Sequence, residues 1–354
     1  MRIESVSFFS LGYNYPTFQA NWSRATFMKL HTARLLSLAT LLFSGVVCAS
    51  PPQLGEWQLL FPNDDGRAVA IDVYRETPVI LDSKGQIFFL NKEIGKESTG
   101  EWFGEVYENW QKVSGGGEAS DISIDGDGIP WVVGLNSKKI YHLDGDFAGQ
   151  NRGWVEHPGN GRGSRISVSK ATGIPYMIGA RSGYIYQGSD KGWTRLPIKL
   201  LDSKGEEINR PLNAMDLYAE SDNAGDTSAT GWHDHVYTVT RDKRVYLYQP
   251  DKQAWQELPG NARAEAIVTS GKLVYIIGDD KKFYGLNLPG DKEWSIAGTG
   301  TGKDLAFSQV DIFQPFITQG GKKVPSSSYR YVWTINESGQ VLRAFVAYQP
   351  LTHH

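Results

Sequence analysis

Short apolar runs and short alternating runs follow one another along most of this chain, and turn residues separate them. Apolar and polar residues alternate at 121–124 and 165–168, and the related runs 70–73, 214–217 and 265–268 combine a single acidic residue with apolar ones. Mostly apolar runs follow four of these, at 130–133, 175–178, 236–239 and 274–277, and a further apolar run lies at 332–335. A period of two over four to eight residues predicts β-strands, and a continuous apolar run bounded by turns predicts buried ones.

A tight turn and one more strand complete each unit, and this hairpin is the most regular part of the pattern. Its copies lie at 83–88, 181–186, 241–246, 279–284 and 337–342. Several carry glycine at the turn, where a two-residue hairpin needs a positive φ. No helical periodicity occurs beyond the first fifty residues, which excludes a solenoid of helix pairs.

Each unit also has a strand led by tryptophan. These residues are Trp57, Trp110, Trp154, Trp193, Trp255 and Trp294. The segments 154–159 and 255–260 share the pattern Trp-x-x-x-Pro-Gly, with an apolar fourth position in the second, and 110–115 and 193–197 are near forms of it. The shortest step between successive tryptophans is 39 residues. Since one tryptophan in the same strand position of every unit is typical of packing, we expect these side chains to lie between blades rather than to bind a ligand.

Four strands in about 40 residues are the signature of a propeller blade. We therefore predict an all-β chain with a six-bladed β-propeller of four antiparallel strands per blade over residues 50–350. Starting each blade at its tryptophan places the blades at about 57–109, 110–153, 154–192, 193–254, 255–293 and 294–346. If the first tryptophan strand pairs with the last blade, it closes the ring. The sequence alone does not decide whether this pairing forms.

The tryptophan-led strands, the apolar strands and the Ile-Tyr ends of the hairpins resemble tectonin repeats over about residues 55–346. Several proteins of that family, the tectonin and tachylectin-like lectins, bind glycans. The resemblance therefore implies a non-enzymatic, lectin-like protein that recognises cell-surface or envelope glycans. The alternative is a protein-interaction scaffold in the bacterial envelope or the secreted space.

The first 49 residues form a separate leader. A basic start from Met28, an apolar run at 35–47 and small residues up to Ala49 predict a secretory signal peptide, 28–49, that is cleaved after Ala49. Translation is then expected to start at Met28. Lipid attachment at Cys48 is the alternative. We expect a secreted or periplasmic protein with no transmembrane span in the mature chain.

The long loops gather on one face. Antiparallel strands alternate in direction, so the predicted loops 91–109, 144–153, 218–235 and 311–330 share a face, whereas 200–211 lies on the other. The aromatic and histidine residues on the shared face are Trp102, Phe103, Tyr107, Trp232, His233, His235 and Tyr329. Exposed aromatic side chains on long loops favour a ligand- or partner-binding face. Alternatively, they are buried beneath their own loops.

Other motifs favour structure over chemistry. The segment 125–128, Asp-Gly-Asp-Gly, has too few acids for a calcium loop and is predicted to be a turn. The cluster 233–235 has two histidines and one acid, but no third histidine at zinc spacing. Glycine-rich loops at 114–117, 159–163 and 298–302 occupy one position in three repeats, and 298–303 departs from a phosphate loop at both ends. Close backbone approach or amide donation to a ligand explains them.

Composition excludes several functions. The formal net charge is −3 and no basic run occurs, so no nucleic-acid partner is expected. The single cysteine leaves with the leader, which excludes thiolate chemistry in the mature chain. No nucleophile–base pair is indicated, and we expect no enzyme activity, cofactor or metal.

Overall fold

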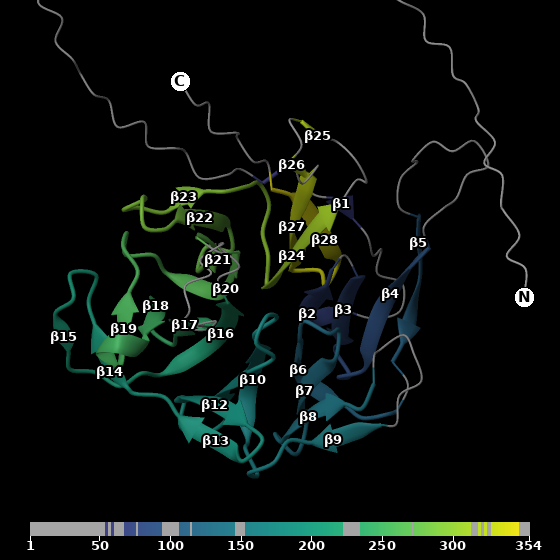
Figure 1. The fold of residues 1–354 in the computed structure, drawn as a ribbon, viewed down its shortest axis with the longest axis horizontal. Helices are drawn as coiled ribbons and strands as arrows, with labels where there is room; N and C mark the ends of the chain where they lie inside the picture. The colour runs from purple at the N-terminus through teal and green to yellow at the C-terminus, as the bar shows by residue number, and fades with distance from the viewer. Residues whose placement is uncertain are drawn as a thin grey trace, which may run out of the picture. The chain divides into compact units, whose positions relative to one another are not determined.

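The computed structural model describes residues 54–55, 58–59, 67–75, 77–93, 106–113, 115–145, 153–221, 234–270, 272–312, 318–319, 322–323 and 327–346. The compact unit that begins at Cys48 holds all of them, and the leader lies outside them. This unit is all-β: six blades of antiparallel strands surround a common axis, which confirms the predicted six-bladed β-propeller (Figure 1). No helix among these residues is long and apolar enough to cross a membrane.

Four blades are plain four-stranded sheets whose strands follow chain order from the axis outward. Blade 1 consists of β2 (Ala68–Tyr74), β3 (Thr77–Asp82), β4 (Ile87–Glu93) and β5 (Val106–Lys112). Blade 2 consists of β6 (Ala119–Ile124), β7 (Pro130–Gly134), β8 (Ile140–Leu143) and β9 (Trp154–Glu156). Blade 3 consists of β10 (Gly163–Val168), β11 (Pro175–Gly179), β12 (Ile185–Ser189) and β13 (Gly192–Arg195). Blade 5 consists of β20 (Ala264–Ser270), β21 (Leu273–Gly278), β22 (Phe283–Asn287) and β23 (Ser295–Ile296).

Blade 4 carries an addition. Its own strands are β16 (Ala214–Ser221), β17 (Asp234–Thr240), β18 (Val245–Gln249) and β19 (Ala254–Glu257), with the short helix η1 (Pro250–Lys252) before β19. The predicted loop 200–211 forms most of a hairpin, β14 (Lys199–Leu201) and β15 (Glu207–Ile208), and β14 pairs parallel to β19. The hairpin thus extends this sheet to six strands and covers its outer side.

Blade 6 closes the ring with both ends of the propeller. It consists of β24 (Asp304–Ile312), β27 (Ser327–Ile335), β28 (Val341–Phe345) and, as its outermost strand, β1 (Gln58–Leu59). A separate small sheet joins β25 (Thr318–Gln319) and β26 (Lys322–Lys323). The pairing of β1 with β28 settles the question of closure: the strand after Trp57 completes the last blade.

The same closure explains why the blades do not match the predicted repeat boundaries. Each tryptophan-led strand is the outer strand of one sheet, and the next strand in the chain is the inner strand of the following sheet. A unit that starts at Trp110, for example, contributes β5 to blade 1 and the rest to blade 2. Boundaries placed at the tryptophans are therefore wrong by one strand, because the sequence repeat runs across two sheets.

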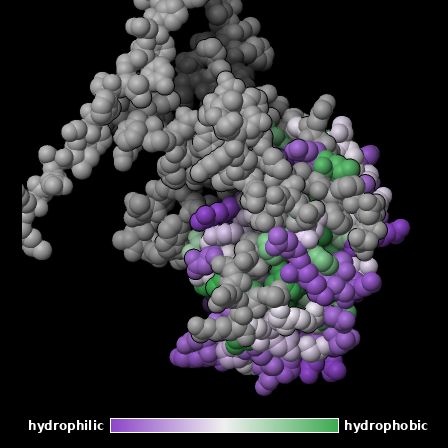
Figure 2. Space-filling model, turned by 90° about the vertical axis from the view of Figure 1, so that its right-hand side faces the viewer, coloured by the Kyte–Doolittle hydropathy of each residue, from purple (hydrophilic) through white to green (hydrophobic). Residues whose placement is uncertain are grey.

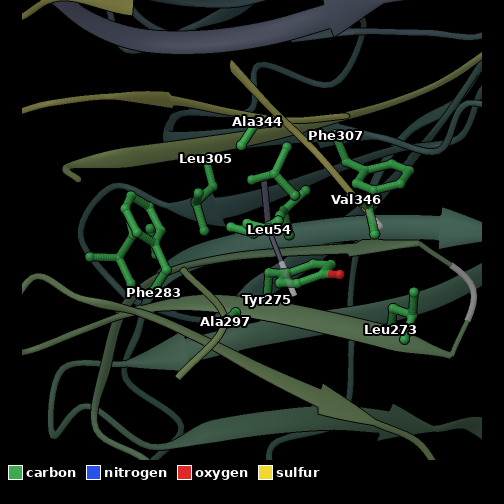
Figure 3. Close-up of a cluster of buried hydrophobic side chains, with 13 residues drawn as sticks. Leu54, Leu273, Tyr275, Phe283, Ala297, Leu305, Phe307, Ala344 and Val346 are labelled. Carbon is green, nitrogen blue, oxygen red and sulfur yellow. The ribbon is translucent and has the colours of Figure 1, made fainter. Parts of the chain in front are cut away.

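Apolar packing beside β1 supports the closure. Leu54 is buried among Phe283 and Ala297 of the blade 5 region and Leu305 and Val346 of blade 6 (Figure 3). The Leu54 amide donates to the Ala297 carbonyl at 2.6 Å. The N-terminal segment therefore joins the last two blades through both hydrophobic contact and hydrogen bonding.

Around the axis, each of the six inner strands contacts the two neighbouring inner strands. Their inner edges have no strand partner, so their amides need another acceptor. Side chains from the preceding blade supply it. The bonds are Ile124 N to Asp72 (2.7 Å), Ile166 N to Asp121 (2.7 Å), Val168 N to Ser123 (3.0 Å), Ala219 N to Ser167 (2.9 Å), Ile267 N to Asp216 (2.9 Å) and Ile71 N to Asp304 (3.0 Å). They join five of the six neighbouring pairs; at the sixth, Ala266 and Val268 of blade 5 pack against blade 6 instead.

The structure explains the tryptophan motif. Trp255 is fully buried, and its indole N–H donates to the carbonyl of Pro197, in the motif of the preceding repeat, at 2.8 Å. Trp294 donates in the same way to Pro259 at 2.8 Å. Trp110, Trp154 and Trp193 are half-buried against the core, and Trp57 lies outside the described residues. The hydrogen bonds from Trp255 and Trp294 to the prolines of the preceding motifs therefore join consecutive repeats.

The Asp-Gly-Asp-Gly segment is the predicted turn. The Asp125 carboxylate accepts the amides of Asp127 and Ile129 and the indole N–H of Trp131. A Cβ at Gly126 would overlap the carbonyl of Lys170 in the adjacent blade, and Gly128 lies against the ring of Tyr74. Close approach between blades thus requires these glycines.

We predict that Trp255→Ala lowers the free energy of unfolding by about 3–5 kcal/mol, because it opens a cavity and leaves the Pro197 carbonyl without its donor. Trp255→Phe keeps most of the volume and should cost less. Denaturant unfolding of the two variants measures both values. Equal losses would contradict a role for cavity formation.

Candidate functional site

The structure gathers few of the residues predicted to form a binding face. Trp102, Phe103, Trp232 and His233 lie outside the described residues, so their prediction remains untested. Tyr107, His235 and Tyr329 lie in β5, β17 and β27 rather than in loops, a correction to the predicted loop bounds. The reason is that these hairpins continue pairing beyond the predicted ends, as Glu220 with His235 and Val310 with Tyr329.

The acidic residue of the 233–235 cluster, Asp234, forms hydrogen bonds between blades. Asp234 accepts hydrogen bonds from Ser169 at 2.6 Å, from Thr172 at 2.9 Å and from Tyr176 at 2.8 Å. These three hydroxyls belong to blade 3, so the carboxylate joins blades 3 and 4. Within the described ranges, no group of three His, Cys, Asp or Glu residues could hold a metal ion.

Among the described residues, a pocket between blades 1 and 2 is a candidate site. It has a volume of about 480 Å³, and we call it the interblade pocket. Its lining residues are Ile87, Gly117, Glu118, Ala119, Val132, Gly134, Leu135, Asn136, Ser137, Tyr141 and Trp154. Tyr141 and Trp154 are half-buried, so both aromatic rings contribute to the surface of the pocket. The repeat pattern predicts a packing role for Trp154 and gives no local signal for this pocket.

The seam between blades 2 and 3 carries different side chains from the seam between blades 1 and 2. In blade 2, Trp131 pairs with His142, and the equivalent pair in blade 1 is Val79 with Phe89. The His157 amide bonds to the Ile140 carbonyl as the Val113 amide bonds to the Ile87 carbonyl. Trp131 and His157 pack at the seam between blades 2 and 3, whereas Val79 and Val113 belong to the buried core beside the interblade pocket.

The glycine-rich loops differ in how closely they cover the indoles. A Cβ at Gly161 would overlap the indole of Trp193, whereas a Cβ at Gly117 would lie 3.8 Å from Trp154. Trp294 is contacted by Gly260, and Trp255 is wholly buried. Close approach thus explains the glycines at 161 and 260. At Gly117 the looser loop leaves the Trp154 ring accessible.

A histidine occupies one motif position that is apolar in the neighbouring repeats. His157 is buried, 4.6 Å from the ring of Trp193 and 5.6 Å from that of Trp131 by centroid distance. Its Nδ1 lies 3.0 Å from the Pro158 carbonyl, the group that accepts the indole bond in two later repeats. The Trp193 indole N–H is buried and has no hydrogen-bond partner among the described residues. Burial lowers the pKa of His157.

Charged residues fill the axis, where a second, smaller cavity encloses about 40 Å³. We call Asp121, Arg165, Asp216 and Asp304 the axial cluster. Arg165 Nη1 lies 2.8 Å from Asp121 and Nε lies 3.7 Å from Asp216. Burial raises the pKa of Asp121 to about 6 and that of Asp304 to about 7, against the influence of Arg165. This cavity is too small for a sugar, so the cluster is structural.

We predict that His157→Leu stabilises the protein most at acidic pH. A histidine whose pKa is lowered by folding takes up a proton more readily when unfolded, so wild-type stability falls as the pH drops below about 6.5. Leucine matches Leu196 and Leu258 at this motif position and does not titrate. Thermal unfolding between about pH 5 and pH 7.5 measures the difference, which should grow on acidification. A constant difference would show that His157 is protonated equally in both states.

No family model matches the sequence, and no curated protein matches it. Many solved structures resemble the chain, among them the following two. The WD40 repeats of RRP9 have a TM-score of 0.45 at 11% identity, with 83% of this chain and 84% of that chain covered. The structure of U3-55K has a TM-score of 0.45 at 11% identity, with 81% and 83% covered.

Proposed function

We propose that this propeller is a non-enzymatic carbohydrate-binding protein that recognises cell-surface or envelope glycans. The observation that carries the proposal is the interblade pocket, in which Tyr141 and Trp154 present aromatic rings beside an amide and a hydroxyl group. A concave, mostly apolar site with a few polar groups is the usual form of a small-ligand site. The tectonin-like repeats support the same class of ligand.

The chemistry of the pocket suits one or two sugar units. The C–H face of a pyranose packs on an indole or phenol ring, and its hydroxyls bond to amide, hydroxyl and carboxylate groups. Asn136, Ser137 and Glu118 supply such groups. The carboxylate of Glu118 disfavours acidic sugars by charge repulsion, so neutral or amino sugars are expected to bind better.

The pocket also defines how many strong sites to expect. At the equivalent positions, Trp193 is covered by Gly161, and Trp255 is covered by the hairpin of β14 and β15. If the interblade pocket acts alone, the affinity is modest and there is no gain from several identical sites in one ring. Among the coloured residues of Figure 2, hydrophobic side chains form separate patches between hydrophilic ones.

We predict that Tyr141→Ala and Asn136→Ala each weaken binding of the best glycan by about tenfold, equivalent to about 1.4 kcal/mol. The control is Tyr284→Ala, because Tyr284 occupies the equivalent hairpin position in blade 5 and does not line the pocket. A glycan array that contains neutral, amino and acidic sugars identifies the ligand. Calorimetry then measures the affinity of each variant.

Two results would overturn the proposal. One is the absence of binding to every glycan on the array and to envelope polysaccharides. The other is glycan binding that Tyr284→Ala weakens as much as Tyr141→Ala does. Recovery of an envelope protein partner, with no glycan bound, would instead support the scaffold alternative.

A further inference from the structure

The seam between blade 6 and blade 1 joins apolar side chains of both blades and includes one titratable side chain at the axis. Asp304 of β24 accepts the amide of Ile71 in β2 at 3.0 Å, and this bond joins the last inner strand to the first. The same blade contains β1, which the chain supplies from the other end of the propeller. This seam is therefore where the ring is closed by segments far apart in sequence.

The axial cluster has more negative groups than positive ones. Three carboxylates, Asp121, Asp216 and Asp304, face one guanidinium, Arg165. Arg165 forms ion pairs with Asp121 and Asp216. Asp304 forms no ion pair with a residue in the described ranges; Arg165 attracts it from a longer distance, and the other two carboxylates repel it. Since burial of a carboxylate without a close ion pair is costly, Asp304 is the member that holds a proton most readily.

Charged groups from the other packed strands do not neutralise Asp304. From β2, Asp72 faces the axis and is paired with Lys170 at 3.2 Å. Lys170 also donates to the carbonyls of Val73 at 2.6 Å and Phe307 at 3.4 Å. From β16, Tyr218 faces the cavity, and from β20 the lining residue is Ile267. The positive charge of Lys170 is therefore committed to Asp72 and to two carbonyl groups.

We propose that the axial cluster is a proton-dependent closure of the ring: a proton held on Asp304 strengthens the seam between blades 6 and 1, and its loss weakens that seam. In the protonated state, the carboxyl group still accepts the Ile71 amide and no longer repels Asp121 and Asp216. In the ionised state, three buried negative charges share one guanidinium. The propeller is then most tightly closed in mildly acidic surroundings.

The direction of the pH dependence follows from the raised pKa of Asp304, about 7 against an ordinary value near 4. The folded state binds more protons than the unfolded state between these two values. The contribution of Asp304 to the free energy of unfolding is therefore fully present below about pH 4 and is lost as the pH rises through about 7. This is opposite in sign to the effect of His157, so the test uses a His157→Leu parent.

The experiment compares this parent with the parent that also carries Asp304→Asn. Asparagine keeps an oxygen for the Ile71 amide but cannot ionise. The hydrogen-exchange rate of the Ile71 amide is divided by the rate of the Ala219 amide. Ser167, which does not titrate, accepts the Ala219 amide as Asp304 accepts the Ile71 amide. The division removes the general effect of pH on exchange. Carbon NMR of the aspartate carboxyls reads the titration of Asp304 directly.

We predict that the exchange ratio rises about tenfold in the parent between about pH 5.5 and pH 8.5, and stays within about twofold in Asp304→Asn. Thermal unfolding should show a higher Tm for Asp304→Asn than for the parent at the higher pH only. Asp280→Asn, on an exposed turn, is the control and should behave as the parent. A constant ratio in the parent, or titration of Asp304 near pH 4, would overturn the proposal.

Discussion

The inner edge of each sheet is the constraint on which this structure depends. Six inner strands meet at the axis, and each presents amides that no further strand can accept. Aspartate and serine side chains of the preceding blade accept them at five seams, and apolar packing serves the sixth. These bonds satisfy buried donors and fix the order of the blades at once. They also bring several carboxylates together, and the charge balance of the axis follows from that arrangement.

On the outer side, the tryptophans have the complementary role. Two of them donate an indole N–H to the proline carbonyl of the preceding motif, Trp255 to Pro197 and Trp294 to Pro259. These repeats are thereby joined at their outer ends as well as at the axis. Where a repeat departs from the pattern, the packing changes locally. His157 stands where later repeats have leucine, and the Trp193 indole N–H has no hydrogen-bond partner among the described residues.

The candidate site therefore arises at a seam between two blades. The interblade pocket lies between blades 1 and 2, and the axial cluster lies at the centre, so the two occupy different parts of the molecule. The propeller is a scaffold of repeated blades in which equivalent positions carry different side chains. That scaffold is compatible with many ligands, so the aromatic and polar groups of the pocket carry the functional argument.

The sequence by itself determined the class of fold. Alternating and apolar runs, turns and six spaced tryptophans predict six four-stranded blades, because these are local patterns of period and spacing. Only the tertiary structure decided which strand belongs to which sheet, since Trp110 ends blade 1 although it starts a repeat. It also showed that Arg165 meets acids from two other blades and that Tyr141 and Trp154 share an open pocket. Such contacts depend on side-chain volume and on distance across the ring, and neither leaves a local signal in the sequence.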